Sequence, residues 1–338
     1  MTEFTRPDGS SGLVPTAPTV AGGQPLAPDA GIDTAVGMDP GIDSTAAAGL
    51  ELQVRSQWSY ARMRFLRHRL AVAGLIGLII IFGAGIFANF VAPYSYAAID
   101  YTNTLHPPTT INQHYFGTDG VGADEFSRVI WGIRTSLEVG VFVAVVSSII
   151  GLIIGAVAGY FGGLLDNVLM RITDLVLTLP ALAILLAFSA LLGNGSQWTI
   201  SIILAAFFWT GIARVVRGVF LSLREKEYVE AAKASGAGDA RIMFRHILPN
   251  TLGPVIVNGT LAVGVAILTE AALSFLGFGI TPPTPSLGAL VNDGQNYPSQ
   301  WWLTIFPGLL IVLIVLCVNF VGDGLRDALD PQQRRMRA

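Results

Sequence analysis

The sequence predicts an all-α integral membrane protein with about six transmembrane helices. Of its 338 residues, 52% are apolar and only 13% are charged, a balance that excludes an ordinary soluble protein of this size. The apolar residues gather in runs close to the about 20 residues that one membrane crossing needs. Lys and Arg residues gather in alternate segments between these runs, which is typical of loops retained in the cytoplasm.

The chain starts with a segment that has no apolar periodicity. Residues 1–55 are rich in Gly, Pro, Ala, Ser, Thr and Asp, and their one aromatic residue is Phe4. Because this composition cannot bury a core, we expect a disordered tail, whose role as a regulator or as a dispensable extension stays open. No basic stretch leads into an apolar one at the start, so we expect no cleavable signal peptide. A basic tail is expected at residues 332–338.

Residues 56–69 combine aromatic and basic side chains. Trp58, Tyr60 and Phe65 stand among four arginines at positions 62, 64, 67 and 69. A helix with this pattern lies at the membrane surface and turns its arginines toward the lipid headgroups. We therefore expect an amphipathic interfacial helix directly before the first span.

The transmembrane domain is expected to cover residues 70–331. Pro93 ends the first apolar run, because proline interrupts a helix. An external segment, 93–136, follows, and its residues 123–136 fit an amphipathic helix lying on the membrane before the second span. A loop at 224–250 separates the fourth and fifth spans. The expected spans are at about residues 70–92, 137–161, 175–192, 199–217, 255–279 and 302–321.

The orientation follows from the basic residues. If the N-terminus is cytoplasmic, only Arg128 and Arg134 of the 20 Lys and Arg residues fall outside. Arg134 stands four residues before Glu138, a spacing that favours an ion pair on one helix face. We therefore expect both termini and the 224–250 loop to be cytoplasmic.

Known catalytic patterns are absent from the sequence. There is no G-x-x-x-x-G-K-[ST] phosphate loop, and the chain has only two lysines, Lys226 and Lys233, neither of them preceded by the required glycines. The four histidines lack metal-ligand spacing, and the single Cys317 forms neither an internal disulfide nor a Cys-based metal site. We expect a chain without catalytic residues, metal or cofactor of its own.

Two features of the spans point to helix contacts. Gly151, Gly155 and Gly159 lie on one face of the second span, and small residues at this spacing let two helices approach closely. The neighbouring helix belongs either to this chain or to a partner. Glu270, inside the fifth span, either lines a translocation path together with Asn258 or is hydrogen-bonded to a neighbouring helix near Asn258 or Thr269.

The 224–250 loop carries charges and apolar side chains together. Its charges alone fit a salt-bridged surface helix, but Val229, Ile242 and Phe244 add more apolar surface than a solvated loop needs, which favours a docking surface for a cytoplasmic partner. The alanines near position 232 favour a helix, which Gly236 ends in the left-handed conformation. Asp239 is expected to cap a second helix, and Pro249 to stop it.

The same loop resembles the EAA loop of the membrane subunits of ABC importers. The matching residues are Glu230, Ala231, Ala232, Gly236, Leu248 and Pro249. His246 stands where the general pattern has isoleucine, and His-Ile-Leu-Pro-Asn at 246–250 is the form usual in the dipeptide and oligopeptide branch. Further stretches resemble the C-type permease of the peptide and nickel group, and the resemblance covers about residues 60–331. They lie at 117–119, 132–137, 159–163, 270–279 and 319–331.

This resemblance implies a type I ABC importer permease fold in the cell inner or plasma membrane. It implies a B-type permease partner, one or two cytoplasmic ATPase subunits that hold ATP and Mg²⁺, and an extracytoplasmic binding protein, with no nucleic acid. The implied function is import of di- or oligopeptides, with nickel or haem import, or a self-sufficient secondary carrier or channel, as alternatives. The implied ATPase-coupling residues are Glu230, Ala231, Ala232, Gly236, Asp239, Leu248 and Pro249.

Overall fold

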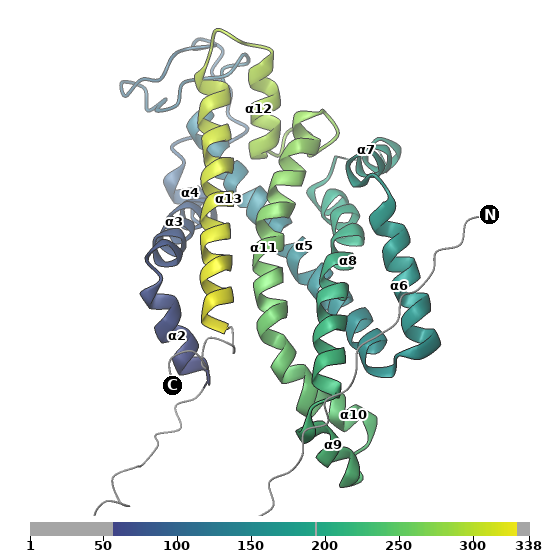
Figure 1. The fold of residues 1–338 in the computed structure, drawn as a ribbon. Helices are drawn as coiled ribbons and strands as arrows, with labels where there is room; N and C mark the ends of the chain where they lie inside the picture. The colour runs from purple at the N-terminus through teal and green to yellow at the C-terminus, as the bar shows by residue number, and fades with distance from the viewer. Residues whose placement is uncertain (1–56, 193–194, 330–338) are drawn as a thin grey trace, which may run out of the picture. The chain divides into compact units, whose positions relative to one another are not determined.

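The computed structural model describes residues 57–192 and 195–329, and the regular elements of these residues are helices (Figure 1). The expected tails at 1–55 and 332–338 lie outside the described residues. The first described helices are α2 (Gln57–Arg67), α3 (Arg69–Ile86) and α4 (Ala88–Val91). They are followed by α5 (Glu125–Phe161), α6 (Gly163–Thr178), α7 (Ala181–Leu192), α8 (Gln197–Arg224), α9 (Glu227–Ala234), α10 (Asp239–Arg241), the π-helix η1 (Ile242–Ile247), α11 (Leu248–Phe275), α12 (Leu287–Gln295) and α13 (Trp302–Leu329).

The prediction of about six spans is confirmed for the described part of the chain. Five helical stretches are long and apolar enough to cross a membrane: α3, α5, α8, the continuous stretch from α10 to α11, and α13. The pair α6 and α7 is the sixth candidate if its two bent halves form one crossing. Among the described residues the only strand-like pairing is two isolated bridges in and beside the segment that joins α4 to α5.

Helix α5 is longer than expected. We expected a surface helix at 123–136 and a separate span at 137–161, but one unbroken helix of 37 residues runs from Glu125 to Phe161. The carboxylate of Asp124 caps it by accepting the N–H of Ser127 at 2.8 Å. No proline interrupts the stretch, and at about 1.5 Å per residue it is roughly 55 Å long. It therefore extends well beyond a hydrocarbon core of about 30 Å.

The expected span at 175–192 is not one helix. Helix α6 ends at Thr178, α7 begins at Ala181, and the two are bent by 82°. Pro180 lies in the break; it has no N–H to donate and it disfavours helical dihedrals at the preceding residue. Leu179 accordingly has φ −71° and ψ 139°. The sequence position of this proline explains the break, although the apolar run continues through it.

The other spans also differ at their ends. The first is interrupted at Phe87, between α3 and α4, before Pro93 is reached. Helix α8 continues to Arg224 and α13 to Leu329, beyond the expected limits. Helix α11 begins at Leu248 and ends at Phe275, four residues earlier than expected, because Gly277 takes a left-handed φ of +83°.

The glycine face of α5 packs against α8 of the same chain. A Cβ on Gly151 would lie 2.8 Å from the carbonyl oxygen of Trp209, and one on Gly155 would lie 2.5 Å from that of Ala213. A Cβ on Gly159 would lie 2.7 Å from the carbonyl oxygen of Arg217. Such distances leave no room for a side chain, so the three glycines allow the two backbones to touch. The neighbour that the sequence left open is therefore internal.

Candidate functional site

The first helix that lies wholly within the EAA loop, residues 224–250, is α9. Its end has the left-handed glycine that the sequence predicts, since Gly236 has φ +81°. The N–H of Gly236 donates to the carbonyl of Lys233 at 2.9 Å, and that of Ala237 donates to the carbonyl of Ala232 at 3.0 Å. These two bonds form a Schellman motif, which satisfies the last carbonyls of a helix. The turn therefore fixes the direction in which the chain leaves α9.

One side of α9 is anchored in the protein. Val229 is fully buried in a cluster that includes Phe220 of α8 and Ile242 and Ile247 of η1. None of the seven predicted coupling residues belongs to this cluster. Glu230, Ala231, Gly236, Asp239 and Pro249 are exposed, whereas Ala232 and Leu248 are half-buried. The loop thus holds a short, anchored helix whose outer face is exposed among the residues that the structure describes, as a docking surface requires.

Asp239 does not cap the second helix. The N-cap position of α10 is Gly238, which has no side chain to accept a hydrogen bond. The Oδ1 atom of Asp239 instead accepts the hydroxyl of Tyr160 at 2.6 Å. The carbonyl of Tyr160 in turn accepts from the guanidinium of Arg224 at 2.9 Å. The EAA loop is therefore fastened to the end of α5, a contact between residues 79 positions apart that the sequence did not indicate.

Pro249 does not stop the second helix either. The chain passes from η1 into α11 without interruption, and Pro249 lies in the first turn of α11. In a regular α-helix its ring would clash with the carbonyl of Arg245, four residues earlier. The wider π-turn removes that clash, and the N–H of Leu248 donates to the carbonyl of Met243 instead. As a result, the EAA loop is continuous with the fifth span.

Two arginines of α8 form ion pairs with acids of α6, the helix that lies beside α8 in Figure 1. Arg217 holds Asp166 with two hydrogen bonds, from Nε at 2.5 Å and from Nη2 at 2.6 Å. Arg214 contacts Asp174 at 2.5 Å. Both acids lie on α6, the first half of the bent pair. These ion pairs connect the bent pair α6 and α7 to α8. Helix α8 in turn contacts the EAA loop, because its Phe220 packs in the same cluster as Val229 of α9.

Asn258 and Glu270 do not meet. Asn258 lies beside a cavity of about 380 Å³ whose walls also include Leu179 at the α6–α7 break and Phe207 and Phe208 of α8. Its amide donates to the carbonyl of Pro254 within its own helix. Glu270 lies outside this cavity, is fully buried, and accepts the hydroxyl of Ser274 at 2.6 Å. The predicted neighbours Asn258 and Thr269 are therefore not its partners.

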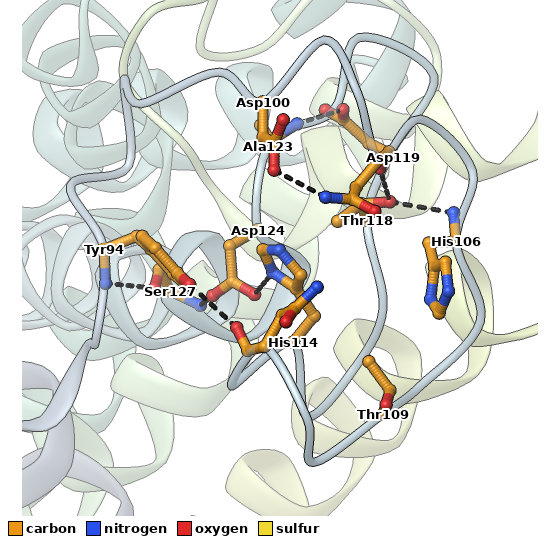
Figure 2. A network of polar contacts seen from close by, with 12 residues as sticks. Tyr94, Asp100, His106, Thr109, His114, Thr118, Asp119, Ala123, Asp124 and Ser127 are labelled. Atoms are coloured by element: carbon orange, nitrogen blue, oxygen red, sulfur yellow. Dashed lines mark hydrogen bonds and ion pairs between the residues drawn. The ribbon is translucent and has the colours of Figure 1, made fainter.

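The segment between α4 and α5 is held by a polar network (Figure 2). The ring of His114 lies 2.8 Å from the Oδ1 atom of Asp124, and both residues are buried. Hydrogen bonds from Thr102 and then Asn103 lower the pKa of Asp100 to about 2.

Within α5, Arg134 contacts Glu138 at 3.0 Å, as its spacing predicts. Within the described ranges, no three His, Cys, Asp or Glu side chains gather as a metal site would require.

Comparison with known proteins gives matches along almost the whole described chain. Residues 151–335 match the family described as the binding-protein-dependent transport system inner membrane component, and residues 56–108 match the N-terminal transmembrane domain of oligopeptide transport permease C.

The curated relatives agree with these family matches. The oligopeptide transport system permease protein OppC of Escherichia coli (strain K12) is 44% identical over 286 residues, covering 84% of this chain and 94% of that protein. The dipeptide transport system permease protein DppC of Alkalihalophilus pseudofirmus is 41% identical, covering 82% and 91%. The glutathione transport system permease protein GsiD of Shigella flexneri is 42% identical, covering 83% and 92%. The chain therefore belongs to the family of inner membrane components of binding-protein-dependent transport systems, whose subunits are non-catalytic permeases.

Proposed function

We propose that this chain is the C-type permease subunit of an ATP-driven peptide importer and that its EAA loop receives an ATPase subunit. The relatives are named for oligopeptides, dipeptides and glutathione, which all contain amide-linked amino acids. The observation that carries the proposal is the exposed face of α9 at Glu230 and Ala231, on a helix that Val229 anchors to the spans. A rigid helix with a free outer face suits docking into another protein.

The proposed complex contains further subunits. A B-type permease completes the pathway, one or two ATPases bind ATP and Mg²⁺, and a binding protein delivers the peptide. The apolar cavity beside Asn258 supports a shared pathway, because it lies between α6, α7, α8 and α11 and has a polar amide in an otherwise largely apolar wall. Asn258 is the residue that we propose as a lining residue.

The proposed orientation places the EAA loop in the cytoplasm. Helix α2 and the end of α13 lie at the same end of the bundle as α9 and α10 (Figure 1). That end also carries most of the basic residues, which favours a cytoplasmic location for it. We infer from this that both termini are cytoplasmic and that the segment 93–124 and α12 are external.

In the proposed mechanism, ATP-driven closure of the ATPases displaces α9. The displacement reaches α5 through Asp239 and Tyr160, and it reaches α11 through the continuous π-turn. A ligand shifts a conformational equilibrium only through contacts that differ between the two states. Glu230, exposed on α9, supplies such a contact by pairing with a basic residue of the ATPase.

The alternatives are less well supported. The names of the relatives give no support to nickel or haem as the transported substrate. A self-sufficient carrier or channel disagrees with membership of a binding-protein-dependent family.

The decisive experiment uses the complete transporter in liposomes with its binding protein. Glu230→Arg should leave assembly intact but abolish peptide-stimulated ATP hydrolysis and uptake of a labelled dipeptide. Glu225→Arg, an equally exposed charge reversal at the end of α8 and outside α9, is the control and should retain both activities. Normal stimulation in Glu230→Arg would reject the coupling role, and uptake without the ATPase would favour the carrier.

A further inference from the structure

Glu270 faces away from the cavity, although it is an ionisable residue inside a span. The α11 residues that line the cavity are Asn258, Leu261, Ala262 and Val265. Glu270 follows Asn258 by twelve residues, which rotates it by about 120° around the helix at about 100° per residue. Its side chain is completely buried, at 0% exposure. The carboxylate therefore does not line this cavity.

The carboxylate ends a directed series of hydrogen bonds. The hydroxyl of Ser286 donates to the Oγ atom of Ser274 at 3.3 Å, and the hydroxyl of Ser274 donates to the Oε1 atom of Glu270 at 2.6 Å. The Ser274 oxygen also accepts the N–H of Ile280 at 3.2 Å. A serine hydroxyl has one proton and two lone pairs, so Ser274 is fully used. The series requires an acceptor at position 270.

These bonds fasten the connection between α11 and α12. Ser274 lies in the last turn of α11, Ile280 lies in the loop, and Ser286 is the N-cap of α12, where its Oγ atom accepts the N–H of Ala289 at 3.2 Å. The loop also reaches α7, because the hydroxyl of Ser189 donates to the carbonyl of Phe278. One buried carboxylate thus holds a loop that joins α11 to α12 and contacts α7, at the end of the bundle opposite the EAA loop (Figure 1).

Close packing surrounds this arrangement. A Cβ on Gly288 would lie 2.6 Å from the carbonyl oxygen of Ala271, and one on Gly132 of α5 would lie 3.2 Å from the backbone nitrogen of Leu287. The start of α12 is therefore wedged against both α5 and α11. A buried hydrogen-bonded group inside such packing selects one arrangement, because removing its partner leaves polar atoms unsatisfied.

Two further polar side-chain atoms in this part of the bundle are buried. The Oε2 atom of Glu270 has no partner among the described residues within hydrogen-bond geometry, and the same holds for the buried Oγ atom of Ser136 on α5. Ser136 contributes to the electrostatic environment of the Glu270 carboxylate, as do Ser274 and Ser286. A small relative movement of α5 and α11 would pair these two atoms or separate them further. Whether these two atoms pair would therefore change with a movement of α5 relative to α11.

We propose that Glu270 is a positioning residue that clamps the external α11–α12 connection shut and thereby sets how readily the external end opens. This proposal rests on the proposed function, which assigns the α11–α12 connection to the external side and makes its opening a step of peptide import. The clamp requires a hydrogen-bond acceptor, and it does not require a negative charge. Gln at position 270 keeps an acceptor oxygen, whereas Leu removes it at similar size.

The test measures external accessibility in the assembled transporter in its membrane, without ATP. Cys317 is the only cysteine, so Cys317→Ser provides a cysteine-free background. The reporter is Ile280→Cys, at a position that is 4% exposed, probed with a membrane-impermeant maleimide. Phe278→Cys, at 43% exposure, is the accessible control. The amount of each variant in the membrane fraction monitors folding.

Glu270→Leu and Ser274→Ala should each raise the labelling rate of Ile280→Cys about fivefold to tenfold, as loss of one buried hydrogen bond does. Glu270→Gln and the neighbouring control Thr269→Val should label as slowly as the parent. Unchanged labelling in both Glu270→Leu and Ser274→Ala would overturn the clamp, and fast labelling in Glu270→Gln would overturn its dependence on an acceptor. Because ATP is absent, Glu230→Arg should not alter the labelling, so failure of the coupling proposal is seen separately.

Discussion

The hydroxyl of Tyr160 donates a 2.6 Å hydrogen bond to the carboxylate of Asp239, and this bond joins the C-terminal end of α5 to the start of α10. Tyr160 is 6% exposed and packs in the same cluster as Val229 of α9. A hydrogen bond to a charged group is stronger than one between neutral groups. The pair therefore provides a direct mechanical connection between the EAA loop and α5.

Tyr160→Phe should weaken this connection without disturbing the packing. It removes one hydroxyl, so we expect a loss of about 1–2 kcal/mol in the stability of the loop. Peptide-stimulated ATP hydrolysis should fall severalfold, while basal hydrolysis is retained. The measurement is the ratio of stimulated to basal rates in the reconstituted transporter.

A double-mutant cycle tests whether the pair acts together. Asp239→Ala alone and Tyr160→Phe alone should cause similar losses of stimulation, and the double variant should be no worse than either, because both single changes remove the same bond. Additive losses would show that the two side chains act independently of each other. Asp239→Asn keeps Oδ1 as an acceptor and should retain most of the stimulation.

Gly155→Ala should separate α5 from α8. The added Cβ would lie 2.5 Å from the carbonyl oxygen of Ala213 and 2.8 Å from the Cβ atom of Val216, so the backbones must move apart. We expect a loss of about 1–3 kcal/mol, the usual cost of overpacking. Gly218→Ala is the matched control, since a Cβ there would meet no described heavy atom within 4 Å.

The two glycine variants should shift stability in opposite directions. In the interior of α8, alanine favours the helix over glycine by up to about 1 kcal/mol. Thermal unfolding of the detergent-solubilised protein should therefore begin at a lower temperature in Gly155→Ala and at an equal or higher one in Gly218→Ala. If Gly155→Ala is as stable as the parent, α5 and α8 can move apart at this contact without loss of stability, and the prediction is wrong.

The sequence predicts local features of this protein better than contacts between distant segments. Gly236 ends α9 as expected, because a left-handed glycine after an alanine-rich helix depends on neighbouring residues only. The partner of Asp239 lies 79 positions away, and no local pattern indicates it. The prediction that Asp239 caps the second helix of the loop is therefore wrong.

Two further predictions are wrong at prolines, because the effect of a proline depends on what surrounds it. Pro180 breaks an apolar run that reads as one span, whereas Pro249 is accommodated by the π-turn of η1 and breaks nothing. The same residue type thus has opposite outcomes within one chain.

Hydropathy alone does not predict the start of α5. Residues 125–136 are less apolar than the rest of that helix, and this part of α5 packs against the start of α12 at Gly132.

Arg217→Lys should loosen α6 from α8 although the charge is kept. The guanidinium of Arg217 binds both oxygens of Asp166, and a lysine ammonium cannot reproduce this two-point contact. Because the pair is partly exposed, solvent screens it, and we expect a loss of at most about 1 kcal/mol. Chemical crosslinking between cysteines introduced on α6 and α8 should become slower. Arg214→Lys is the control. The guanidinium of Arg214 makes a single hydrogen bond to Asp174, so this variant should change the crosslinking rate less.

Gly236→Ala should impair coupling through backbone strain alone. Gly236 has φ +81°, a conformation that alanine adopts only at a cost of about 1 kcal/mol, while its added Cβ would meet no described heavy atom within 4 Å. The Schellman bonds to Lys233 and Ala232 should therefore weaken and α9 should fray at its end. Gly236→Asn is the informative comparison, because asparagine tolerates the left-handed region better than alanine although it is larger. Peptide-stimulated ATP hydrolysis should thus decrease in the order Gly, Asn, Ala. An order that follows side-chain size, with Asn below Ala, would instead mean that the bound ATPase needs the space above Gly236.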